Sequence, residues 1–136
     1  MEKKGEILFG ELKTCNFPDI NNRVYSVRVL KQALKKFNVH KKFRAGELVL
    51  TYPSNFSETA TDLHKISHRI LNIKRRGNKF FASARILKSF NGRVLNEINV
   101  KDFKFCLRGI GNVEYKNGHN YITNLEILAI DICPNI

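Results

Sequence analysis

The sequence predicts a strand-rich α+β domain, a small antiparallel barrel that is closed or nearly closed and carries one main helix. Three observations support this fold class. Only one stretch has a convincing helical pattern, apolar and β-branched segments dominate the chain after it, and glycine-containing turns separate these segments. The 136 residues include no linker-like stretch rich in proline, glycine or serine, so we expect a single domain over residues 1–136.

The first elements follow from local sequence. The apolar segment around Ile7–Leu12 predicts a strand, and the polar stretch Pro18–Asn22 predicts a turn. Ser26 is a suitable helix N-cap, and apolar residues recur at helical spacing after it. The main helix is therefore expected from Ser26 to about Phe37, followed by a basic connection.

Strands are expected to dominate the rest of the chain. The weakly alternating segment Glu47–Tyr52 leads into Pro53–Asp62, a loop rich in serine, threonine and asparagine. Asn-Gly or Gly-Asn pairs predict turns at positions 77–78, 91–92 and 116–119, and Val94–Val100 fits either a short helix or a loop. The remaining expected strands are Leu63–Ile73, Lys79–Lys88, Phe103–Leu107, Asn112–Tyr115 and Tyr121–Ile132.

The charge of the chain is strongly positive, with a formal net charge of +12 at pH 7. Such an excess favours an acidic partner, either nucleic acid or an acidic protein surface. A first cluster lies on one stripe of the helix and in the connection after it, and consists of Arg28, Lys31, Lys35, Lys41, Lys42 and Arg44. A second cluster surrounds the turn at Gly77 and consists of Lys74, Arg75, Arg76 and Lys79. Each cluster alone is typical of a solvated face or loop tip, but the total excess favours a binding surface.

Composition excludes several classes of protein. No apolar run approaches the roughly 18 residues of a membrane span, and the charged start Met1–Glu6 lacks the apolar stretch of a signal peptide. We therefore expect an intracellular or virion protein without a membrane partner. Cys15, Cys106 and Cys133 are odd in number and widely spaced, which predicts free thiols rather than a disulfide framework or a zinc site. No cofactor and no metal are expected.

One segment has the form of a protease motif. Phe105–Gly111 begins as a strand and runs into Arg-Gly-Ile-Gly, which resembles the Ser-[Ser/Ala]-Arg-Gly-x-Gly signature of tailed-phage prohead maturation proteases. That family has a herpesvirus serine protease-like fold, the assemblin fold. The resemblance covers roughly residues 6–134, and its further matches are Asn21–Tyr25 with the helix after it, Gly46–Leu48, Ile66–His68 and Leu128–Pro134.

Two positions depart from the family pattern. Cys106 stands where the resemblance implies the nucleophilic serine, and Tyr52 stands where it implies the catalytic histidine. A phenol, with a pKa near 10, is a poor general base at neutral pH. We therefore expect no catalytic residue, only remnant positions that lie near one another in space: Tyr52, His68, Cys106, Arg108 and Gly109.

Two chemical alternatives stay open. A Cys106 thiolate beside Arg108 would be stabilised and could act as a nucleophile, with His68 or His64 as base, although a strand cysteine is more often a small buried residue. His64 and His68 would share one face of a helix as metal ligands do, but the segment reads as a strand, which separates them by about 13 Å. A structural histidine at position 68 is the favoured interpretation.

Three functional hypotheses follow. The favoured one is a non-catalytic phage structural or assembly protein, located in the virion or in the cytoplasm of the infected bacterial host. Its basic surface would bind either DNA or other virion proteins, in a homo-oligomeric or multi-protein assembly. The second is an active prohead-type protease that uses Cys106. The third is a basic nucleic-acid-binding module whose stacking residues are drawn from Phe43, Phe80, Phe81 and Phe90.

Overall fold

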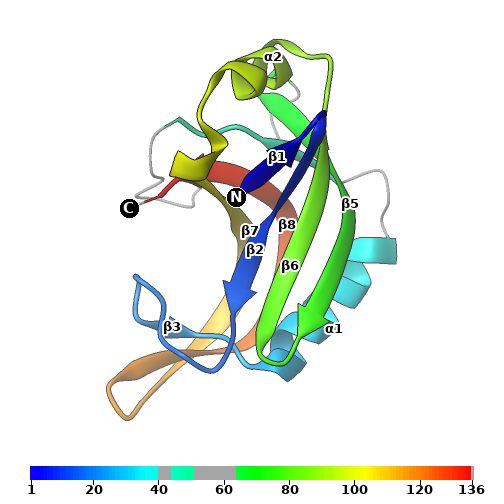
Figure 1. Ribbon diagram of the computed structural model, residues 1–136. Helices are drawn as coiled ribbons and strands as arrows, with labels where there is room; N and C mark the ends of the chain where they lie inside the picture. Colours follow the sequence, from blue (N-terminus) through cyan, green and yellow to red (C-terminus); the bar gives the residue numbers. More distant parts are fainter. Residues whose placement is uncertain (40–43, 51–63, 136) are drawn as a thin grey trace.

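Two sheets form the body of the protein in the computed structural model, which describes residues 1–39, 44–50 and 64–135 (Figure 1). The five-stranded sheet has the order β1-β2-β6-β5-β4, and the three-stranded sheet has the order β3-β8-β7. The elements are β1 (Glu2–Lys4), β2 (Ile7–Thr14), β3 (Arg23–Val24), α1 (Val27–Val39), β4 (Ala45–Glu47), β5 (Ile66–Arg76), β6 (Lys79–Ile86), α2 (Phe90–Glu97), the 3-10 helix η2 (Val100–Asp102), β7 (Phe103–Lys116) and β8 (His119–Pro134).

The five-stranded sheet has one face in the core and one face toward solvent. Strand β6 sets the pattern, because Phe80, Ala82, Ala84 and Ile86 are buried and the residues between them are not. A tight turn at Gly77 joins β5 to β6, as the sequence predicted. In Figure 1 this sheet crosses in front of β7 and β8. The core therefore lies between the two sheets.

The three-stranded sheet is dominated by the long β7–β8 hairpin. The two strands pair along their length from Phe103–Pro134 to Lys116–His119, so β7 is one continuous strand and not the two short strands that we expected. Two register shifts accompany this pairing, one at Arg108 and Gly109 and one at Asn112 and Val113. The short strand β3 adds to β8 in parallel.

One seam joins the two sheets. Leu48 forms a parallel bridge with Ile132 of β8, and the Val49 N–H donates to the Ile132 carbonyl at 2.8 Å, so the chain after β4 lies along β8. Residues of β2, of β7 and of the loop between β2 and β3 line a cavity of about 460 Å³, and β2 also contacts β7. Among the described residues the strands form two sheets and no closed barrel, so of the two expected forms, closed or nearly closed, the closed one was wrong.

Helix α1 begins where the sequence predicted. The Ser26 hydroxyl accepts a hydrogen bond from the Val29 N–H at 3.1 Å, which is the N-cap contact. The apolar stripe of the helix, with Leu30, Leu34 and Phe37, is buried in the core, and α1 packs against β8. Its stability therefore comes mainly from tertiary packing of one face.

The second helix corrects one expectation, because the Asn91-Gly92 pair lies inside α2 and not in a turn. Of the two forms expected for Val94–Val100, helix or loop, the first four residues are helical in α2, and η2 begins at Val100. Ser89 caps α2, because its hydroxyl accepts the Gly92 N–H at 3.0 Å. In the part of the chain that the structure describes, no helix is long and apolar enough to cross a membrane.

Candidate functional site

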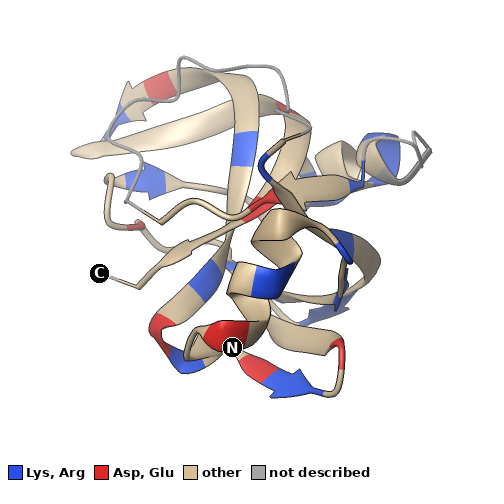
Figure 2. Cartoon of the chain, turned by 90° about the horizontal axis from the view of Figure 1, so that it is seen from above, with Lys and Arg blue, Asp and Glu red and all other residues tan. Residues whose placement is uncertain are grey.

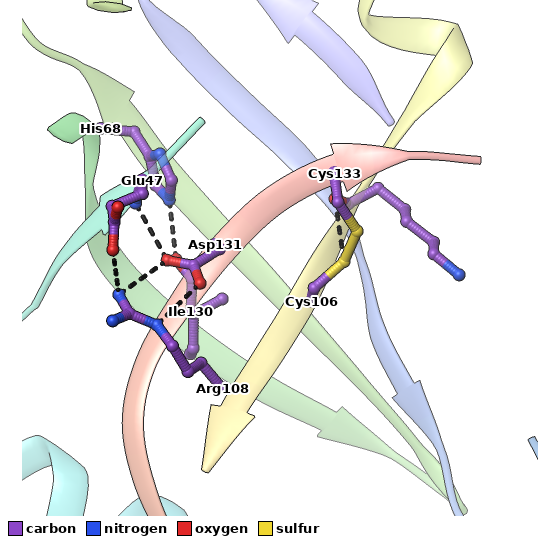
Figure 3. The surroundings of a disulfide bond; sticks show 8 residues. Glu47, His68, Cys106, Arg108, Ile130, Asp131 and Cys133 are labelled. Atoms are coloured by element: carbon purple, nitrogen blue, oxygen red, sulfur yellow. Dashed lines mark hydrogen bonds and ion pairs between the residues drawn. A yellow bond between two sulfur atoms is a disulfide. The ribbon is translucent and has the colours of Figure 1, made fainter. Parts of the chain in front are cut away.

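Cys106, the residue at the expected nucleophile position, forms a disulfide with Cys133 (Figure 3). The two cysteines lie on the same face of the β7–β8 ladder, because Cys106 is opposite Asp131 and Cys133 is opposite Lys104. Their Cα atoms are 6.4 Å apart, within the range that a disulfide spans. The prediction of three free thiols was therefore wrong, and Cys15 alone is free, in a buried position.

Burial raises the pKa of the Cys15 thiol, although Lys13 and Arg75 act in the opposite direction. A thiol that stays protonated is a weak nucleophile and a weak metal ligand. Cys15 therefore behaves as a small core residue.

Arg108, two residues after Cys106, is held by two buried carboxylates. Its guanidinium donates to both carboxylate oxygens of Asp131, at 2.9 and 3.2 Å, and contacts the Glu47 carboxylate at 2.7 Å. The side chains of all three residues are less than 10% exposed. The Glu47 N–H also donates to Asp131 at 2.9 Å, so this triad ties β4, β7 and β8 together near the seam of the two sheets.

His68 lies in β5, fully buried, with both ring nitrogens engaged. The Ile130 carbonyl lies 2.8 Å from Nε2 and can only accept, so Nε2 carries the proton and Nδ1 accepts from the Ser67 hydroxyl, also at 2.8 Å. Burial lowers the pKa of His68 to about 4, and the Ile130 carbonyl and Asp131 offset that effect only in part. The imidazole is therefore neutral at physiological pH and acts as a bridge between β5 and β8.

Gly46 is required by this bridge. A Cβ atom on residue 46 would collide with both the Ile130 carbonyl oxygen and the His68 ring. Gly46 pairs with His68 across β4 and β5, so only glycine lets the imidazole reach β8. The Gly46-Glu47-Leu48 motif thus has an architectural explanation: clearance at Gly46, an ion pair at Glu47 and a bridge to β8 at Leu48.

The remaining remnant positions are placed only in part. Tyr52 lies outside the described residues, so its distance to the other positions stays a prediction. The His68 ring is 6.3 Å from the ring of Phe105, the residue before Cys106, so β5 and β7 do bring these segments together. Figure 3 shows the His68 ring directed at Ile130 and Cys106 directed at Cys133. Gly109 lies at the register shift of β7, where a Cβ atom would come within 2.7 Å of the Glu126 carbonyl oxygen.

Two adjoining cavities lie along β7. The larger, of about 460 Å³, is lined by Cys106 and Phe105 of β7 and by Lys13 of β2. The smaller, of about 280 Å³, continues past Gly109 and Gly111 and shares Arg23, Tyr25 and Leu107 with the larger one. Lys13 is not available as a free cation there, because it pairs with Asp19 at 2.7 Å and lies 4.4 Å from the centre of the Tyr25 ring.

The lysine and arginine positions are distributed over many elements of the chain (Figure 2). On α1, Arg28, Lys31 and Lys35 are exposed on the side opposite the buried stripe, as predicted. Arg44 is half-buried, whereas Lys41 and Lys42 lie outside the described residues. At the β5–β6 turn, Lys74, Arg75, Arg76 and Lys79 are all exposed.

Sequence reasoning missed the partners that position these residues. Glu47 and Asp131 were part of recognised motifs, but nothing in the sequence assigned them to Arg108. Asn22 was also missed: its side chain donates to the Gly118 carbonyl at 2.8 Å and accepts from Nδ1 of His119 at 2.6 Å. The tip of the β7–β8 hairpin is therefore fixed to the loop before β3, and His119 is half-buried rather than solvent-exposed.

The histidine pair does not form a metal site of the helical kind. His64 lies in an exposed turn before β5, and His68 lies in the strand. Among the described residues, no group of three or more histidine, cysteine, aspartate or glutamate side chains is arranged to hold a metal ion.

Comparison with known proteins supports the fold. No family model matches the chain, and no curated protein does. Among solved structures, the bacteriophage T4 capsid assembly protease, gp21, matches with a TM-score of 0.79 at 18% sequence identity, over 96% of this chain and 82% of that chain. At this identity the match shows the fold alone. It confirms the strand-rich, prohead-protease-like architecture that the motifs predicted.

Proposed function

We propose that this chain is a non-catalytic structural or assembly component of a phage virion, a pseudoenzyme built on the prohead-protease fold. The observation that carries the proposal is the bond between Cys106 and Cys133, because the residue at the nucleophile position has no free thiol while that bond is intact. A sulfur in a disulfide cannot attack a peptide carbonyl, since the thiolate is the nucleophile.

The disulfide also favours a virion location. Disulfides persist in oxidising surroundings, which include virion surfaces, and are rare in the reducing cytosol. A protease that processes a capsid precursor inside the host would need Cys106 reduced, whereas a structural component that leaves the cell does not. The disulfide is thus easier to reconcile with the structural role.

The groups beside Cys106 further support a role without catalysis. Arg108 is neutralised by Asp131 and Glu47, so its charge is directed at carboxylates and not at Cys106. The Nδ1 lone pair of His68 accepts from Ser67, and Nε2 carries the proton, so this imidazole has no free basic nitrogen.

The proposed contact surface for virion proteins is the basic stripe of α1, which comprises Arg28, Lys31 and Lys35 and continues in sequence to Lys41, Lys42 and Arg44. The exposed side of the helix presents cations in a straight row, and the buried side fixes its direction against β8. Such a row is complementary to an acidic surface of another virion protein.

The catalytic half of the proposal is tested with the reduced protein. The chain is incubated in reductant with phage capsid precursor proteins and with a thiol-directed activity probe, beside a Cys106→Ala variant and a Cys15→Ala control. We expect no cleavage by any of the three proteins. Cleavage that requires Cys106 would establish the alternative, a reducible cysteine protease.

The assembly half is tested by particle association. Charge reversal of Arg28, Lys31 and Lys35 to Glu should remove the chain from purified virions or from a reconstituted assembly, while the folded state stays intact because these side chains are exposed. The matched control reverses Arg69, Lys74 and Arg76, which changes the net charge equally at another surface. Association that survives the α1 reversal but not the control would refute the assignment.

A further inference from the structure

The outer face of the five-stranded sheet has no part in the proposed assembly role. Strand register defines this face, because residues opposite one another across an antiparallel ladder share a side. In β6 the inward residues are buried, so Phe81, Ser83 and Arg85 point outward, and the register extends the face to β2 and β5. Figure 1 shows the sheet in front of β7 and β8, with this side free of other described elements.

Two aromatic rings lie at the centre of this face. Phe9 pairs with Ser83 and Glu11 pairs with Phe81, which makes Phe9 and Phe81 diagonal neighbours on adjacent strands, with Cα atoms about 7–8 Å apart. Phe9 is 45% exposed and Phe81 is half-buried. Two phenyl rings held side by side on an open sheet form a stacking platform of the kind that RNA-recognition sheets use.

Cations outnumber carboxylates on the face that carries the rings. Between β5 and β6, Lys74 pairs with Phe81. Arg69 pairs with Arg85 toward one end of these two strands, and Arg76 pairs with Lys79 at the other end, next to the turn. On the other side of β6, Lys4 of β1 pairs with Ile7 of β2, and Ile7 in turn pairs with Arg85 of β6. The carboxylates of the same face are fewer, although two of them lie beside the rings: Glu2 pairs with Phe9, and Glu11 pairs with Phe81 and accepts from Thr14. Glu6 is 3.7 Å from Arg85.

We propose that this face binds single-stranded nucleic acid, with bases stacked on Phe9 and Phe81 and phosphates paired with the surrounding lysines and arginines. The combination of exposed rings with interspersed cations distinguishes this ligand from an acidic protein, which would need the cations but not the rings. A duplex is disfavoured because its base faces are hidden in the stack. Neither a phenyl ring nor a cation reads the sugar, so DNA and RNA should bind alike.

The contribution of stacking is tested with Phe9→Ala. Binding of the full chain to fluorescein-labelled oligo-dT and oligo-rU is followed by anisotropy over a range of salt concentrations. Loss of one stacking partner should weaken binding about fivefold to a hundredfold and leave the salt dependence unchanged, because no phosphate contact is lost. The matched control is Phe90→Ala, whose ring is 74% exposed on α2 and should be neutral.

The contribution of charge is tested with two matched triple variants. Reversal of Arg69, Lys74 and Arg76 to Glu should abolish binding at moderate salt, whereas reversal of Arg28, Lys31 and Lys35 on α1 should weaken it far less. For the corresponding neutral variants, Arg69→Gln, Lys74→Gln and Arg76→Gln, the logarithmic salt slope should fall by up to about 2, since each phosphate contact on a single strand contributes about 0.7.

Several outcomes would overturn the proposal. One is the absence of binding to either oligonucleotide at low salt in a protein with a normal thermal melt. A second is equal affinity for a duplex or for heparin, which would mean that stacking contributes nothing. A third is an equal loss of oligonucleotide affinity in Phe9→Ala and Phe90→Ala, or a loss of affinity in the α1 triple variant alone. Either result would place any nucleic-acid contact elsewhere. Capture of an acidic virion protein by this face instead of nucleic acid would also refute it.

Discussion

The buried imidazole of His68 should make the protein less stable in mild acid. The ring is neutral in the folded state, because burial lowers its pKa from 6.5 to about 4. In the unfolded chain the same ring takes up a proton near pH 6.5. Between these two pKa values the unfolded state binds more protons, so the free energy of unfolding falls as the pH is lowered through this window and is fully regained above it.

The size of the effect follows from the same two values. A difference of one pKa unit corresponds to 1.36 kcal/mol, so the complete loss is about 3 kcal/mol, reached below about pH 4. Between about pH 7 and about pH 5 the expected loss is about 2 kcal/mol. This is a large share of the stability of a small domain, which is of the order of 5–15 kcal/mol.

The measurement is urea unfolding of the oxidised protein at both pH values, for the wild type and for His68→Gln. The glutamine amide can still donate to the Ile130 carbonyl but does not titrate, so the pH-dependent loss should shrink by about 2 kcal/mol relative to wild type. His64→Gln is the matched control, because it makes the same substitution at an exposed histidine outside the buried bridge. An equal loss in wild type and His68→Gln would refute the assignment of the buried neutral ring.

Three further outcomes follow from the same contacts. Alkylation in denaturant without reductant should modify one cysteine, Cys15, whereas after reduction all three cysteines should react. Reduction should also lower the free energy of unfolding by about 3 kcal/mol, because the disulfide closes a segment of 27 residues. Three adducts before reduction would contradict the disulfide. Arg108→Met should cost about 3–5 kcal/mol in urea unfolding, because it strands two buried carboxylates, whereas Arg85→Met, which removes the exposed pair with Glu6, should cost less than about 1 kcal/mol. Gly46→Ala should lower the free energy of unfolding by about 3 kcal/mol or more, because the added Cβ atom collides with His68 and Ile130. Gly77→Ala is the comparison and should lower it by about 1 kcal/mol, because the backbone there is strained but the space is open. Equal losses would show that clearance at residue 46 is unimportant.

Local sequence predicted the elements whose signals are local. The Ser26 cap with the apolar stripe of α1 and the glycine turn between β5 and β6 depend on neighbours within one or two turns of chain. Two other glycines that were read as breaks lie inside elements, Gly92 in α2 and Gly111 in β7. A Cβ atom at residue 92 would collide with the Leu87 carbonyl, and one at residue 111 with the Asn124 carbonyl. These glycines serve close packing of backbone on backbone, which sequence spacing does not reveal.

The site depended on contacts across strands, which sequence spacing does not encode. Cys106 and Cys133 are 27 residues apart and have no motif in common, yet the β7–β8 register places them diagonally on one face. A closed barrel was a reasonable expectation from the number of strands. Among the described residues it does not form, because β2 and β7 come into contact without pairing, and sequence spacing does not show which neighbouring strands pair.

The residues that carried the resemblance to proteases converge on one structural feature. Gly46 and Glu47 lie in β4, Leu48 follows it, His68 lies in β5 and Arg108 in β7. All five meet β8 between Ile130 and Ile132. This is the seam at which the two sheets join. Each of these five residues has a contact there that the fold needs whether or not a peptide is ever cleaved: clearance, an ion pair, a backbone bridge or a buried hydrogen bond. Motifs of this kind therefore identify the architecture, and catalysis has to be decided at Cys106 and Tyr52, the two positions at which this chain departs from the pattern.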